Sequence, residues 1–245
     1  MSKVPPPVQI PQPPAPSSGL AADAVASGLP VHPVDRVRLF SPDQWEHFVQ
    51  EWVDSLRDEY ELVERCGGAG DMGRDVIATV NGGNGAWDNY QCKHYQKVLA
   101  PGDIWVELGK LAYYTLKGEY SYPRNYFFVA PQGVGPKLSN LLKKPHVLRD
   151  GLLTNWDKAC RTEITKTEVV DCDAAMKEHI ANLDFSIFKT KPLLHIIEAH
   201  AKTRWYVARF GGGLPPRPEP TPPPGVPTDN EAVFVGELRR AYADH

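Results

Sequence analysis

The stretch GGAGDMGRDVIATV, residues 67–80, decides the fold together with the tripeptide QCK at residues 91–93. Residues 75–80 are rich in β-branched side chains and follow glycines, a pattern that predicts a strand. Residues 87–94 predict the next strand. The glycine-rich residues 81–85 between them predict a loop or hairpin connection. Two neighbouring strands are therefore expected on either side of a short return.

The same stretch places three chemically useful groups together. Side chains two apart in a strand project from one face, so Gln91 and Lys93 point together while Cys92 points into the opposite layer. A hairpin-like return brings the Asp75 carboxylate beside Gln91. The Asp75 carboxylate, the Gln91 amide oxygen and the Cys92 carbonyl suit Mg²⁺, with Mn²⁺ as a possible substitute. Lys93 would orient an attacking water or stabilise an oxyanion.

Working outward, the period of the apolar residues alternates between helix and strand. Ser41 is a suitable N-cap and Pro42 suits the first helical position, so a helix is expected to run from there to near Tyr60. Strands are expected at 61–66, 75–80, 87–94 and 125–130, a second long helix at 104–116, and short helices at 137–144, 156–161, 173–182 and 193–203. This order predicts an α/β fold with a mixed central sheet flanked by helices, followed by a mostly helical region.

The prolines divide the chain. Of the 24 prolines, nine lie in residues 1–36 and eight in 211–230. We expect a disordered Pro-rich arm (1–36), which could alternatively be a polyproline docking tail. The expected body comprises a core at 37–135 and a helical extension at 136–210. A Pro-rich linker (211–230) and a C-terminal interaction helix (231–245) are expected to follow, the helix carrying an apolar stripe of Phe234, Val235, Leu238 and Tyr242.

Composition excludes several classes of function. A formal net charge of −3 excludes a protein that holds nucleic acid by bulk positive potential, so any such contact must come from local patches. No stretch approaches the roughly 18 apolar residues of a membrane span, and we expect a cytoplasmic protein without a membrane partner. The four cysteines form no CxxC pair and are expected to be reduced.

The motifs resemble a known nuclease family. A Trp45-Glu46 pair on the first helix, a Gly-Asp-x-Gly turn before Asp75, and the Gln91-x-Lys93 strand are similar to the Mrr-like branch of the PD-(D/E)xK superfamily. The resemblance covers roughly residues 40–131. It implies a restriction-endonuclease-like core and Mg²⁺-dependent cleavage of double-stranded DNA, with Glu46 completing the catalytic set of Asp75, Gln91 and Lys93.

One feature departs from the superfamily pattern. Neutral Gln91 replaces the usual acidic residue, which predicts weaker metal binding unless Glu46 or Asp71 supplies a carboxylate. We favour Glu46, because Asp71 could equally be the turn former of its Gly-Asp-x-Gly setting. Glu46 could also be an ordinary exposed helix residue.

A second resemblance concerns the rest of the chain. Residues 126–133, 152–156, 183–188 and 208–213 are similar to segments of the effector subunits of Lamassu and ABC three-component antiphage systems. This resemblance implies a nuclease held inactive beside an SMC-like ATPase and an accessory subunit. Because one such centre cuts one strand, a double-strand break needs two, so we expect a homo-oligomer, a dimer or tetramer.

Other residues that could bind DNA or a metal also have ordinary structural explanations. Lys137, Lys143 and Lys144 could contact DNA phosphates, or could belong to a solvated helix face. His195 and His200 are five apart and would lie on different faces of a helix, which disfavours a metal site. His94 should have a packing role.

Two other functions stay open. The same fold could serve as a catalytically weak or inactive subunit that binds DNA or scaffolds a complex. An Mrr-like restriction enzyme is the second alternative, and it would need a separate DNA-reading domain.

Overall fold

The computed structural model describes residues 31–67, 70–211 and 229–243. They belong to two separate units, one within residues 1–210 and the other within 211–245. The first unit contains a five-stranded sheet with helices α2 to α9, and the second contains helix α10.

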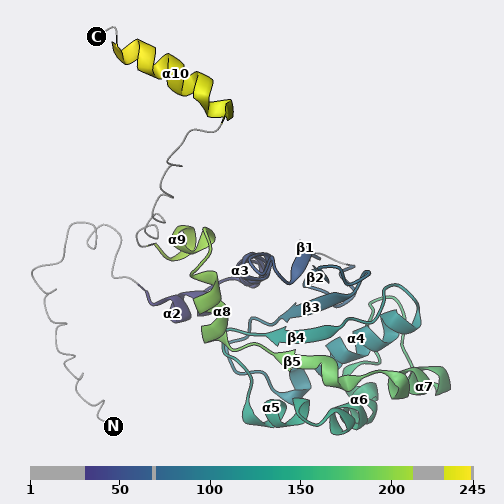
Figure 1. Ribbon diagram of the computed structural model, residues 1–245. Helices are drawn as coiled ribbons and strands as arrows, with labels where there is room; N and C mark the ends of the chain where they lie inside the picture. Colours follow the sequence, from purple (N-terminus) through teal and green to yellow (C-terminus); the bar gives the residue numbers. More distant parts are fainter. Residues whose placement is uncertain (1–30, 68–69, 212–228, 244–245) are drawn as a thin grey trace, which may run out of the picture. The chain divides into compact units, whose positions relative to one another are not determined.

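The sheet is mixed. Its strands are β1 (Tyr60–Arg65), β2 (Val76–Val80), β3 (Trp87–Cys92), β4 (Asn125–Val129) and β5 (Phe188–Thr190), and they lie side by side in chain order (Figure 1). β1, β2 and β3 are antiparallel, whereas β3, β4 and β5 are parallel. The expected α/β class with a mixed sheet is therefore confirmed.

Helical crossovers join the parallel strands, as parallel pairing requires. The crossover from β3 to β4 contains η1 (Pro101–Asp103) and α4 (Trp105–Leu116). The crossover from β4 to β5 contains α5 (Pro136–Leu142), α6 (Pro145–Ala159), α7 (Ala174–Asn182) and η2 (Phe185–Ile187). α4 to α7 all lie on one side of the sheet (Figure 1). There they bury a core that includes Trp105, Leu108, Tyr126, Phe128 and Trp156.

The other face of the sheet carries a second core. It is covered by α3 (Pro42–Asp54) and α8 (Leu193–His200), with α2 (Pro33–Arg38) and α9 (Trp205–Phe210) alongside. Phe127 belongs to this core and its neighbour Phe128 to the first, so β4 is buried on both faces. A strand covered on both sides reads as a continuous apolar run, which explains the NYFFV sequence.

Helix α3 begins as expected. The Ser41 hydroxyl accepts a hydrogen bond from the Gln44 backbone N–H, and the Gln44 side chain accepts one from the Ser41 N–H. This capping box satisfies two N–H groups that the first turn leaves without partners. The helix ends at Asp54, earlier than the expected Tyr60, because Tyr60 is a buried strand residue that pairs with Val80.

Three further elements differ from expectation. The helix expected from residue 156 starts at Pro145, since proline is compatible with the first helical turn. β5 lies within the region expected to be helical, and its three residues are too few to show a strand period. Residues 33–36, expected to be disordered, belong to α2, whose first N–H groups include one capped by the His32 side chain.

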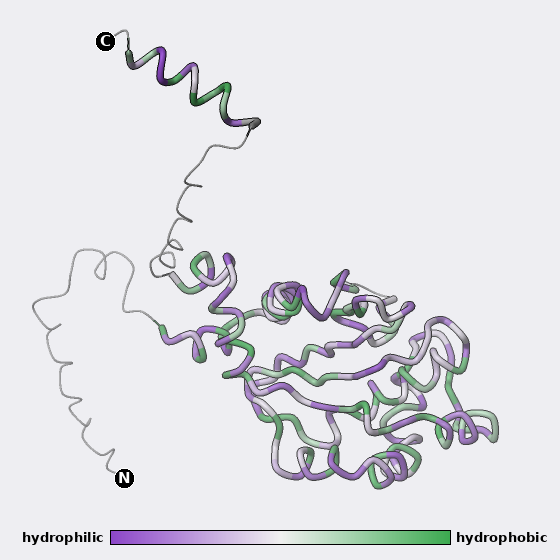
Figure 2. Tube along the Cα trace, in the orientation of Figure 1, coloured by the Kyte–Doolittle hydropathy of each residue, from purple (hydrophilic) through white to green (hydrophobic). Residues whose placement is uncertain are grey.

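The expected arm and linker fall mostly outside the described residues, which begin at 31 and leave out 212–228. Helix α10 (Asp229–Ala243) begins two residues before the expected start at 231. Hydrophobic and hydrophilic residues alternate along the helix (Figure 2), and Phe234 and Tyr242 are 68% and 79% exposed. Among the described helices, none is both long and apolar enough to cross a membrane.

Candidate active site

The register of β2 and β3 places Asp75 opposite Gln91. Val76 pairs with Tyr90 in this antiparallel ladder, so Asp75, which directly precedes β2, faces Gln91 on β3. On its other side, the Asp75 carbonyl accepts a hydrogen bond from the Cys66 N–H at 2.8 Å. Asp75 is thus held at the end of the sheet by its own carbonyl on the β1 side and by the pairing of the next residue, Val76, on the β3 side.

The Asp75 carboxylate is buried, with only 8% of the residue exposed. Its Oδ2 atom accepts two hydrogen bonds, from Gln91 Nε2 at 2.7 Å and from the Cys92 backbone N–H at 2.6 Å. Burial raises the pKa of Asp75 to about 7, although the Cys92 N–H and the Lys93 ammonium oppose this shift; the Glu107 and Glu46 carboxylates add to it. An oxygen that costs free energy to ionise is a favourable place for a cation to bind.

The Gln91 side chain is oriented by β4. Its Oε1 atom accepts a hydrogen bond from the Tyr126 hydroxyl at 2.8 Å, and its amide nitrogen faces Asp75. We expected the Gln91 oxygen to be a metal ligand beside Asp75. The structure instead directs that oxygen away from Asp75, because the phenol of Tyr126 supplies the donor it needs within the buried layer. Gln91 in this orientation supports the Asp75 carboxylate.

Lys93 directly follows β3 and reaches into the helical layer. Its Nζ atom lies 2.6 Å from Glu107 Oε1, and only 13% of the Lys93 side chain is exposed. Burial lowers the pKa of Lys93, but the Glu107 carboxylate outweighs burial and raises it above the usual value. Lys93 is therefore an ammonium ion with a fixed position, as expected of a group that stabilises charge.

Glu107 is the residue that sequence reasoning missed. It is 3% exposed on α4, and its Oε2 atom is buried without a hydrogen bond, although Lys110 Nζ lies 3.5 Å away. The available signal was an acidic residue directly beside the apolar stripe of the helix at 104–116. A buried carboxylate needs a charged partner, and Lys93 supplies it.

Glu46 approaches the site from α3. The neighbouring Trp45 is buried and its indole N–H donates to the Val129 carbonyl at 3.3 Å, which fixes the helix against the sheet. The Glu46 side chain is 26% exposed and lies 3.5 Å from Arg65. Burial raises the pKa of Glu46, against the lowering effect of Arg65. Because Glu46 in turn raises the pKa of Asp75, the two carboxylates share one electrostatic environment.

The loop before Asp75 is a turn closed by a side-chain hydrogen bond. Asp71 Oδ1 accepts a hydrogen bond from the Gly73 N–H at 2.9 Å, so the interpretation of Asp71 as a turn former is confirmed. Met72 and Gly73 have positive φ values of 55° and 80°. A Cβ atom on Gly73 would lie 3.1 Å from the side chain of Lys110, so glycine allows this loop to pack closely on α4.

The other residues singled out from the sequence lie outside this group of carboxylates and Lys93, except for the Cys92 backbone. The Cys92 backbone contributes its N–H to Asp75, while burial raises the pKa of its thiol. Lys137, Lys143 and Lys144 are exposed on α5 and at the junction with α6. His195 is exposed and His200 is buried against Glu51, so the two imidazoles do face different ways. His94 packs near Trp45 and bonds the Val37 carbonyl, which confirms its packing role.

The donor set fits a hard cation in part. Within the described residues, no group of three or more His, Cys, Asp or Glu side chains is arranged to hold a metal ion. Both hydrogen bonds to Asp75 reach Oδ2, and Oδ1 accepts none from the described residues. The Asp75 and Glu46 carboxylates are the oxygen ligands that Mg²⁺ prefers, whereas the Gln91 oxygen is engaged by Tyr126.

Neither a family model, a curated protein nor a solved structure matches this chain.

Proposed function

We propose that the protein is a Mg²⁺-dependent DNA endonuclease with a restriction-endonuclease-like core. The observation that supports this most directly is the proximity of a buried carboxylate, Asp75, and a fixed ammonium ion, Lys93, at the ends of adjacent strands. The Glu46 carboxylate from α3 adds to the same negative environment. Strongly perturbed pKa values caused by burial and a specific charged partner are concentrated at functional sites.

Each residue has a distinct role in this proposal. Asp75 and Glu46 would hold the ion, and Mg²⁺ when bound would supply charge neutralisation and a more acidic water. Gln91 and the Cys92 N–H fix the rotamer of Asp75 by their two hydrogen bonds. Lys93, permanently protonated, would stabilise the negative charge that develops on the phosphate.

The ion pair with Glu107 limits what Lys93 can do. A lysine whose pKa is raised does not give up its proton readily, so Lys93 does not act as the general base. The attacking water must therefore lose its proton to an acceptor other than Lys93. The site therefore favours a mechanism in which Lys93 supplies positive charge and the ionised Asp75 would serve as an ion ligand.

The first test is cleavage of supercoiled plasmid DNA by the purified protein. We expect nicked and then linear DNA with Mg²⁺ and none with EDTA. Lys93→Gln should abolish the products while leaving the fold intact, as judged by circular dichroism. Plasmid that stays intact at high protein concentration with Mg²⁺ and with Mn²⁺ would refute the proposal.

The second candidate is a catalytically weak or inactive subunit that binds DNA or scaffolds a complex. The orientation of Gln91 favours it, because the amide oxygen accepts a hydrogen bond from Tyr126 and the amide nitrogen, not the oxygen, faces Asp75. Under this alternative, Mg²⁺ would not change the stability of the protein, and Lys93→Gln would leave its biological effect unchanged.

We further propose that the nuclease is the effector of an antiphage system and works as a homo-oligomer, controlled by an SMC-like ATPase and an accessory subunit. The exposed apolar side chains of α10, Phe234 and Tyr242 among them, support a surface for protein contacts. Light scattering of the wild type and of Phe234→Ser/Tyr242→Ser tests this. A monomeric wild type that makes double-strand breaks would contradict the oligomer.

A further inference from the structure

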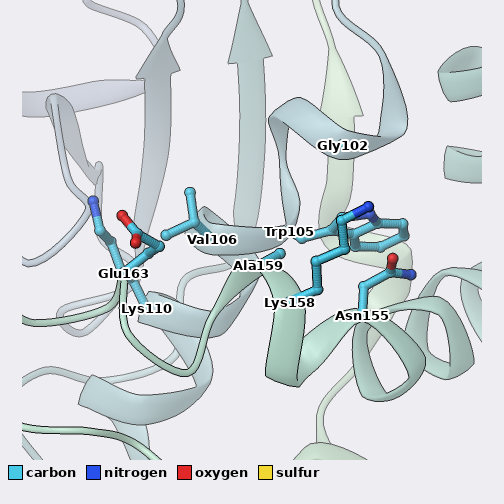
Figure 3. Close-up of a pocket in the computed structure, with 8 residues that line it drawn as sticks. All are labelled: Gly102, Trp105, Val106, Lys110, Asn155, Lys158, Ala159 and Glu163. Carbon is cyan, nitrogen blue, oxygen red and sulfur yellow. The ribbon is translucent and has the colours of Figure 1, made fainter.

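A pocket of about 500 Å³ lies between α4 and the end of α6, on the same helix that carries Glu107 (Figure 3). Its walls combine apolar and cationic side chains. Trp105, Val106 and Ala159 supply the apolar surface, and Lys110 and Lys158 supply the positive charge. Gly102, Asn155 and Glu163 complete the lining.

The two lysines stand at opposite ends of this pocket. In Figure 3, Lys110 lies beside Glu163, whereas Lys158 lies with Asn155 near the Trp105 ring. Among the described residues, Lys158 has no ion-pair partner, and Lys110 pairs only with Glu107. Glu163, the one acidic residue lining the pocket, does not neutralise both lysines. The pocket therefore has a net positive charge.

The pocket is joined to the candidate active site through one carboxylate. Glu107 Oε1 lies 2.6 Å from Lys93 Nζ, and Glu107 Oε2 lies 3.5 Å from Lys110 Nζ. Lys110 is one helical turn along α4 from Glu107, on the path from the site to the pocket. A DNA strand with one phosphate at Lys93 would bring its neighbouring phosphates towards Lys110.

The stem of Lys110 is held in place by the loop before Asp75. Its Cβ and Cδ atoms lie 3.1 Å from the position that a Cβ of Gly73 would occupy, so the stem packs directly on this glycine. Only 24% of the Lys110 side chain is exposed. A lysine whose stem is fixed presents its ammonium group in a defined place, unlike a freely rotating surface lysine.

We propose that this pocket binds the sugar-phosphate backbone of the DNA strand next to the cleaved phosphate, with Lys110 and Lys158 each contacting a phosphate. The apolar wall of Trp105, Val106 and Ala159 would pack against the sugars. The inference rests on the proposed endonuclease function and deepens it. It differs from a path over Lys143 and Lys144, which lie at the start of α6, roughly 20 Å along that helix from Lys158.

The test measures how salt weakens binding to a short DNA duplex, by fluorescence anisotropy in EDTA so that no cutting occurs. Each phosphate contact contributes about 0.9 to the slope of log K against log salt concentration. Lys110→Gln/Lys158→Gln should therefore lower the slope by about 1.8. Lys158→Gln alone should lower it by about 0.9, and this variant disturbs no ion pair of the active site. The control Lys117→Gln/Lys177→Gln removes the same charge from two exposed positions, one directly after α4 and one on α7, and should leave the slope unchanged.

The outcomes separate this inference from the proposed function. If the wild type cuts DNA with Mg²⁺ but Lys158→Gln and the double variant keep the full slope, the pocket assignment is wrong while the endonuclease stands. A slope that falls only in Lys143→Gln/Lys144→Gln would place the DNA strand at the start of α6 and would likewise overturn the pocket assignment. A wild type that neither binds nor cuts DNA would refute both.

Discussion

Replacing Asp75 by asparagine should stabilise the protein while removing its activity. The carboxylate is buried, and its pKa is raised from the usual 3.8 to about 7 mainly by burial. Three pH units correspond to about 4 kcal/mol of free energy. At pH 8 wild-type Asp75 is ionised in both states, and the folded state bears this cost. Asparagine can keep both hydrogen bonds, because Gln91 and the Cys92 N–H both donate to the same oxygen.

The sign of the pH dependence follows from proton linkage. Because the folded pKa is raised, the folded state binds the proton more tightly, so stability is highest below pH 3.8 and is lost as the pH rises towards 7. Asparagine has no such dependence. The advantage of Asp75→Asn should thus fall from about 4 kcal/mol at pH 8 to under about 2 kcal/mol at pH 5. For a body of this size, the pH 8 value is a rise in Tm on the order of 10 °C.

A matched control is available on the neighbouring strand. Asp88 is fully buried, but it accepts hydrogen bonds from Arg124, Tyr60 and Asn125, and these outweigh burial and lower its pKa. Asp88→Asn should therefore destabilise the protein at pH 8, by about 3 kcal/mol. Thermal unfolding of both variants at pH 5 and pH 8 tests this reasoning. It is refuted if Asp75→Asn lowers Tm at pH 8, or if its effect is the same at both pH values.

The remaining predictions concern Mg²⁺ binding, the ion pair between Lys93 and Glu107, and the loop before Asp75. Mg²⁺ at about ten times its Kd should stabilise the wild type by about 1.4 kcal/mol at pH 8 and leave Asp75→Asn unchanged; an equal Tm shift in both would place the ion elsewhere. Glu107→Gln should lower kcat by about tenfold or more, on the order of 1.4 kcal/mol, because Lys93 loses its ionic partner; unchanged kcat would show that Lys93 needs no clamp. Gly73→Ala should cost about 2 kcal/mol of stability through its positive φ and its 3.1 Å approach to Lys110, as measured by urea unfolding. Gly118→Ala, with a similar φ and no neighbour within 4 Å, should cost about half as much. Equal losses in the two variants would show that the close approach to Lys110 does not contribute to the cost at Gly73.

The sequence was sufficient wherever one hairpin determines the geometry. Asp75 and Gln91 lie opposite each other because the return at 81–86 is short and strand side chains alternate, both of which are local properties. The turn role of Asp71 and the cap at Ser41 are local as well. The family likeness to nucleases, in contrast, depends on residues from different elements and remains a proposal.

The features that sequence reasoning missed depend on contacts across long stretches of chain. Glu107 meets Lys93 only after the crossover through α4 folds back on the sheet, and no spacing in the sequence encodes that contact. The direction of the Gln91 amide is set by Tyr126 on β4, thirty-five residues away. Pairing with β4 likewise creates β5 from three residues that have no pattern of their own.

The central claim is that Asp75 and Lys93 form a metal-dependent phosphodiesterase site, and cleavage by Asp75→Asn tests it most directly. This variant is expected to be more stable than the wild type, so a loss of activity cannot be attributed to unfolding. We predict that wild-type protein with Mg²⁺ nicks supercoiled plasmid and that Asp75→Asn, at the same concentration and with a higher Tm, gives no product. Cleavage by Asp75→Asn at the wild-type rate would contradict the claim.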